Sequence, residues 1–83
     1  MTLKDRLQLL RDARRMAYRN GRHDTPLKKG WLIITYFGLG DYQDYRVAYQ
    51  ANEGEHAQLI LRAKRLNKAE LLAIAGWIEA ERL

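Results

Sequence analysis

The chain has 83 residues, of which 47% are hydrophobic and 30% are charged. This length and composition are typical of one small globular domain over residues 1–83 and exclude a disordered chain. Because cysteine is absent, disulfides, thiolate zinc sites and cysteine nucleophiles are excluded too. The longest apolar stretch, Trp31 to Phe37, is too short to cross a membrane, and the N-terminus is not a signal peptide. We therefore expect a cytoplasmic protein without membrane insertion.

The charge is unevenly distributed along the sequence. The chain carries a net charge of +5, with a balance of +6 over residues 1–30, −3 over 31–55 and +2 over 56–83. Such charge blocks bear on partners and solubility and say nothing of the fold.

Residues 2–20 are expected to form a helix. Thr2 can cap its N-terminus together with Asp5, in a variant of the capping box, and Gly21 is placed to end it. At about 100° per residue, one half of the helix carries apolar side chains and the other half is basic. The basic half consists of Lys4, Arg11, Arg15, Arg19 and Arg22.

Extended segments follow this helix. The polar segment 22–30 contains the only proline and is expected to be a loop. Residues 31–37 are mostly β-branched or aromatic, which favours a strand. After turn signals at 38–41, residues 45–51 alternate large apolar and other side chains, the pattern of a half-buried strand.

Segment 56–65 fits two structures. As a strand, residues 56–62 place Ala57, Leu59 and Leu61 on one face, and as a helix they show a broad apolar side. The short turn at 52–55 favours a hairpin, so we expect a third strand and keep the helix as the alternative.

The last helix is expected from Asn67, as its cap, to about Arg82, with Glu70 as the reciprocal acid. The sequence thus predicts an α+β domain of order α-β-β-β-α, in which two helices pack on a three-stranded antiparallel meander.

The last helix is apolar nearly all round. We assign the stripe Leu71, Ile74, Ala75 and Ile78 to the core. A second side then needs a cover, which is either the first helix or another protein. The candidate interface residues on this helix are Ala69, Leu72, Ala73, Gly76, Trp77 and Ala80.

The first strand is also apolar on both sides. Trp31, Ile33 and Phe37 share one face, and Leu32, Ile34 and Tyr36 share the other. Helices cover one face of such a sheet, so the remaining face is either covered by loops or open to a partner. The second triplet is our candidate interface on the sheet.

The basic residues suggest an alternative partner. The basic half of the first helix and the cluster Arg62, Lys64, Arg65 and Lys68 could meet phosphates of duplex nucleic acid, although solvated helix faces are often basic. The α-β-β-β-α order is similar to that of the double-stranded-RNA-binding domain, where lysines at the start of the last helix meet phosphates. The Lys-Lys-x-Ala-Lys stretch of that family is missing, since residues 65–70 read Arg-Leu-Asn-Lys-Ala-Glu.

No catalytic constellation is present in the sequence. His23 and His56 lack partners at metal-ligand spacing, serine is absent, and no threonine has an obvious base. We expect no enzyme activity, no metal and no cofactor. The sequence favours a small binding protein, of the type of phage or mobile-element regulators and inhibitors, that modulates a larger protein machine through protein–protein contacts. A homodimer could use one apolar surface, and a subunit or chaperone of a larger complex fits equally well.

Overall fold

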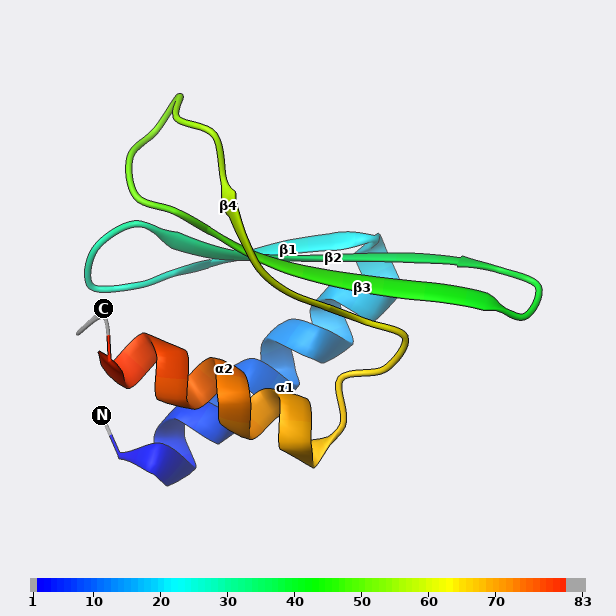
Figure 1. Ribbon diagram of the computed structural model, residues 1–83, viewed down its shortest axis with the longest axis horizontal. Helices are drawn as coiled ribbons and strands as arrows, with labels where there is room; N and C mark the ends of the chain where they lie inside the picture. The colour runs from blue at the N-terminus through cyan, green and yellow to red at the C-terminus, as the bar shows by residue number, and fades with distance from the viewer. Residues whose placement is uncertain (1, 81–83) are drawn as a thin grey trace.

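The computed structural model describes residues 2–80 as two layers, a four-stranded antiparallel sheet with both helices on one of its faces (Figure 1). The strands follow one another in the sheet in chain order, which confirms the predicted α+β meander with one strand more. The elements are α1 (Leu3–Asn20), β1 (Arg22–Pro26), β2 (Trp31–Leu39), β3 (Tyr42–Gln50), β4 (Gln58–Ala63) and α2 (Lys68–Ala80).

Helix α1 begins and ends where the sequence predicts. The hydroxyl of Thr2 accepts a hydrogen bond from the Asp5 amide at 3.1 Å, and the Asp5 carboxylate accepts one from the Thr2 amide at 3.3 Å. Gly21 adopts the left-handed conformation with φ of 83°, and its amide donates to the Ala17 carbonyl. Each end of the helix therefore has a backbone group satisfied by a local partner, the Asp5 amide at the start and the Ala17 carbonyl at the end.

Strand β1 corrects the expectation of a loop over 22–30. Residues 22–26 pair with β2, with Thr25 opposite Leu32. The segment has a single β-branched residue, so its composition does not favour a strand. As an edge strand it pairs on one side only, and Pro26, which lacks an amide donor, stands at its end.

The ambiguous segment is a strand, as expected. Residues 58–63 form β4 at the other edge of the sheet, and its pairing with β3 contains an irregularity between Val47 and Ala48. The hairpin between β2 and β3 turns through Gly40 and Asp41, with Leu39 opposite Tyr42 and a φ of 59° at Gly40. Two-residue hairpins need positive φ, which glycine adopts without strain.

The core lies between the helices and the sheet. The stripe predicted for the last helix is buried, so that assignment is confirmed for α2. This stripe packs against Leu10, Ala13 and Ala17 of α1 and against Leu32, Ile34 and Val47 of the sheet. The end of the helix predicted at Arg82 lies outside the described residues. Neither of the helices described is long and apolar enough to cross a membrane.

Candidate functional site

The outward side of α2 is apolar, and none of the residues that the structure describes covers it. Five of its candidate interface residues are exposed, namely Ala69, Leu72, Ala73, Gly76 and Ala80. Leu72 keeps 38% of its surface exposed. A Cβ built on Gly76 meets no atom within 4 Å, so the middle of the helix faces open space. A helix that is apolar nearly all round is normally covered on more than one side.

Helix α1 does not cover this side of α2. The two helices share the core, and near the end of α2 the Arg6 guanidinium donates to the Glu79 carboxylate at 3.0 Å. Of the two alternatives for the cover of this side, the one in which α1 packs against the small residues of α2 is therefore not found. Trp77 differs from the other candidates because it is half-buried. The centroid of its ring lies 5.2 Å from that of Tyr49.

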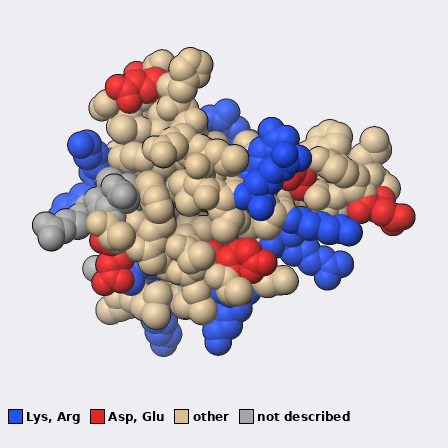
Figure 2. All heavy atoms as spheres, in the orientation of Figure 1, with Lys and Arg blue, Asp and Glu red and all other residues tan. Residues whose placement is uncertain are grey.

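The space-filling view shows few charged side chains in this area. In Figure 2 the surface over α2 is mostly uncharged, with acidic and basic side chains at its border. The exposed apolar residues of α2 therefore lie in a region of low charge, and contiguous apolar surface marks interaction sites more often than surface that simply faces solvent.

The three interface candidates on β2 are not on an open surface. Leu32 and Ile34 are fully buried in the core. Tyr36 is half-buried, with ring centroids 4.9 Å from Tyr18 and 4.6 Å from Tyr45. Because the helices cover this face of β2, we correct these residues from interface to core positions.

The open face of the sheet is the one that carries Trp31 and Phe37. These residues are 36% and 58% exposed. Two shallow grooves, with volumes of about 330 and 460 Å³, lie on this face and share Thr35 and Arg46 as lining residues. We call this face the outer face of the sheet.

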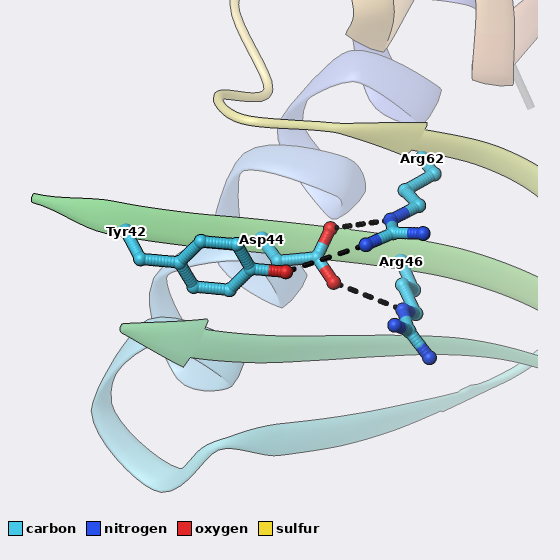
Figure 3. Close-up of polar contacts among 4 residues, drawn as sticks. All are labelled: Tyr42, Asp44, Arg46 and Arg62. Atoms are coloured by element: carbon cyan, nitrogen blue, oxygen red, sulfur yellow. Dashed lines mark hydrogen bonds and ion pairs between the residues drawn. The ribbon is translucent and has the colours of Figure 1, made fainter. Parts of the chain in front are cut away.

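Four residues form a polar cluster on the outer face (Figure 3). The Asp44 carboxylate accepts a hydrogen bond from Nε of Arg46 on one oxygen and from Nε of Arg62 on the other, each at 2.9 Å. Nη2 of Arg62 also reaches the Tyr42 hydroxyl at 3.3 Å. The hydrogen bond from Arg62, followed by that from Arg46, lowers the pKa of Asp44, although burial of this carboxyl acts in the opposite direction. Asp44 therefore holds two guanidinium groups in place as an ionised anchor.

This cluster was missed at the level of sequence, apart from Arg62. Arg46 stands opposite Arg62 on β4 and opposite Thr35 on β2, and Thr35 stands opposite Arg22 on β1. Three arginines therefore occupy one row across the sheet. The alternation of Tyr42, Asp44 and Arg46 along one strand is the signal that places them on one face.

The structure divides the predicted basic surface between several places. Its members are all exposed: Lys4, Arg11, Arg15, Arg19, Arg22, Arg62, Lys64, Arg65 and Lys68. Arg22 belongs to β1 and the outer face, so its assignment to the helical stripe is wrong. Ion pairs with Asp12, Asp24 and Asp44 offset the charges of Arg15, Arg22 and Arg62, respectively. On α1 itself, the pair of Arg15 with Asp12 leaves fewer arginines of the basic stripe without an acidic partner.

Within residues 2–80, no group of three or more histidine, aspartate or glutamate side chains is arranged to hold a metal ion. Comparisons of the chain with known protein families, with characterised proteins and with solved structures found no match.

Proposed function

We propose that this protein is a non-enzymatic binding protein that modulates a larger protein through contacts made by the outward side of α2. The observation that supports the proposal is the uncovered apolar stripe of α2 with Gly76 at its centre. Glycine inside a helix costs about 1 kcal/mol of stability relative to alanine. That cost is not offset within the domain, since a side chain at Gly76 would meet nothing within 4 Å.

The chemistry of the stripe indicates how a partner would bind. The small side chains of Ala69, Ala73, Gly76 and Ala80 allow another backbone to come close to the helix. Leu72 and the half-buried Trp77 flank this stripe with larger apolar surface. Buried aromatic and aliphatic anchors contribute most of the binding energy of a typical protein interface. The regulatory effect would follow from occupying a surface of the larger protein.

The test compares variants of the tagged protein in its native host. Ala73→Arg places a charge on the stripe, and Gly76→Leu fills the open space, while neither position contributes to the core. The matched control is Gln8→Arg, which adds the same charge to an exposed position of α1. Each protein is purified from nuclease-treated lysate, and its melting temperature is measured to show that it is folded.

We expect the wild type and Gln8→Arg to retain the same protein partner in stoichiometric amounts, and both α2 variants to lose it. Sedimentation of the purified protein shows whether that partner is a second copy of the chain. Equal recovery of the partner with all four proteins, or no partner with any of them, would contradict the proposal that α2 binds a protein partner.

A further inference from the structure

We propose that the outer face of the sheet binds single-stranded nucleic acid, with a phosphate on Arg46 and Arg62 and an unpaired base on the exposed rings of Phe37 and Tyr42. This function does not depend on the outward side of α2, because the residues that it uses lie on strands β2, β3 and β4. Either proposal can fail while the other holds.

The two arginines have the geometry of an anion clamp. They stand opposite each other on β3 and β4 and bind different oxygens of Asp44 through Nε. Among the residues that the structure describes, Arg46 has no partner for either Nη group, and Arg62 uses only Nη2, on Tyr42. Donors remain free on both guanidinium groups, which are already oriented before a ligand arrives. Such preorganisation lowers the entropic cost of binding.

The charge of the cluster suits one phosphodiester. Asp44 is 8% exposed and ionised, and together with two arginines it leaves a net charge of +1. One singly charged phosphate would neutralise it, and arginine donors match phosphate oxygens in geometry. Arg22 lies in the same row, two strands from Arg46, at about 10 Å by the usual strand spacing. It is paired with Asp24 through Nε and Nη2 and would act as a secondary contact.

Exposed aromatic rings lie beside this clamp. Phe37 stands opposite Asp44 in the β2–β3 pairing. Its ring packs against that of Tyr42 at a centroid distance of 5.9 Å, and the two side chains keep 58% and 50% of their surface exposed. Both residues line the 330 Å³ groove together with Arg46. A base stacked on these rings would therefore sit next to the bound phosphate.

The combination of features favours a single strand over other anions. Bases of a duplex are stacked on one another and cannot reach rings on a sheet, whereas unpaired bases stack readily on aromatic side chains. An acidic protein segment would satisfy the arginines and leave the rings without a specific contact. The neighbouring 460 Å³ groove, with Ile33 and Ala48 among its lining residues, offers room for a second nucleotide.

The test measures fluorescence anisotropy of labelled oligonucleotides of about ten nucleotides, as poly-dT, as poly-U and as a duplex of equal length. The variants are Arg46→Gln with Arg62→Gln, and separately Phe37→Ala, which changes an exposed side chain and leaves the core intact. The matched control is Arg11→Gln with Arg19→Gln, which removes the same charge from α1. Ala73→Arg is measured as well, and melting curves establish that every variant is folded.

We expect the single strands to bind more tightly than the duplex, and the poly-dT and poly-U arms to show whether the protein prefers DNA or RNA. Phe37→Ala should weaken binding by about fivefold to a hundredfold. For the Arg46→Gln, Arg62→Gln variant, the plot of log binding constant against log salt concentration should be less steep. The slope should fall by about 0.7 for each phosphate that the protein no longer neutralises. The α1 control and Ala73→Arg should bind like the wild type.

Several results would overturn the proposal. Absence of binding at about 50 mM salt is one, and tighter binding of the duplex is another. An equal or greater loss in the Arg11 and Arg19 variant would place the nucleic acid on α1 instead. Competition by poly-glutamate with no effect of Phe37→Ala would identify an acidic protein as the ligand of the outer face.

Discussion

Gly76→Ala is expected to stabilise the isolated protein. Gly76 lies inside α2, four residues before its last described residue, and a Cβ there meets no atom within 4 Å. The substitution therefore removes the conformational cost of glycine without creating a clash. The gain is about 0.8–1.0 kcal/mol. For 83 residues with an unfolding entropy of about 2.1 cal/mol/K each, this corresponds to a rise in Tm of about 5 °C.

The assay is thermal unfolding followed by circular dichroism, at several protein concentrations. Ala73→Gly is the matched control, because it makes the reverse change at an exposed position of the same helix. It should lower Tm by a similar amount. A Tm for Gly76→Ala that is unchanged or lower would refute the reasoning, since it would mean that the helix surface at Gly76 is covered in solution.

The same substitution separates stability from binding. If a partner backbone approaches α2 at Gly76, the added methyl group should weaken partner capture although the protein itself becomes more stable. Partial unfolding would lower both the stability and the capture of the partner, so it does not explain weaker capture by a more stable protein. Tighter or equal capture by the more stable Gly76→Ala protein would contradict a close approach at this position.

Three other substitutions test the fold. Gly30→Ala should destabilise the protein strongly, because φ is +82° and a Cβ would collide with the carbonyl oxygen of Gln50 and the ring of Tyr49; urea denaturation measures the loss, and an unchanged midpoint would contradict the turn geometry. Thr2→Ala should cost about 1 kcal/mol through loss of the helix cap, visible as a Tm lower by about 5 °C, whereas Thr2→Ser should retain most of the stability. Asp44→Asn tests the anchor for the two arginines. Because the pKa of Asp44 is lowered in the folded state, its ionised form stabilises the fold above the ordinary aspartate pKa of about 3.9, and this contribution disappears as the pH falls through the folded pKa. Denaturation should therefore show the wild type to be more stable than Asp44→Asn at pH 6, by a margin that shrinks below about pH 4; a margin independent of pH would show that the ion pairs do not stabilise the fold.

The helices and the order of the strands could be predicted from local signals. Each of these signals depends on residues that lie close together in the chain: the cap at Thr2, the stop at Gly21 and the apolar stripe of the last helix. Strand β1 was missed because its formation depends on pairing with β2 and its own residues provide little preference for extended structure. An isolated polar strand at a sheet edge has no signal that a single sequence reveals.

The surfaces were harder to predict than the elements. Period-two alternation divides β2 into two triplets, but both are apolar, so the alternation does not say which of them the helices cover. The structure assigns Leu32 and Ile34 to the core and leaves Trp31 and Phe37 outside. The cluster around Asp44 depends on the register between β3 and β4, which includes the irregularity near Val47.

The two edges of the sheet also restrict how other molecules can attach. At β1 the free edge is five residues long, carries the Arg22–Asp24 ion pair and ends at Pro26. At β4 the pairing with β3 shifts its register near Val47, and an irregularity of this kind interrupts the regular row of backbone donors and acceptors. Features of this kind protect a sheet against edge-to-edge aggregation. The same protection disfavours recognition by strand addition, which leaves side chains on the two faces of the domain as the better surface for the partners proposed above.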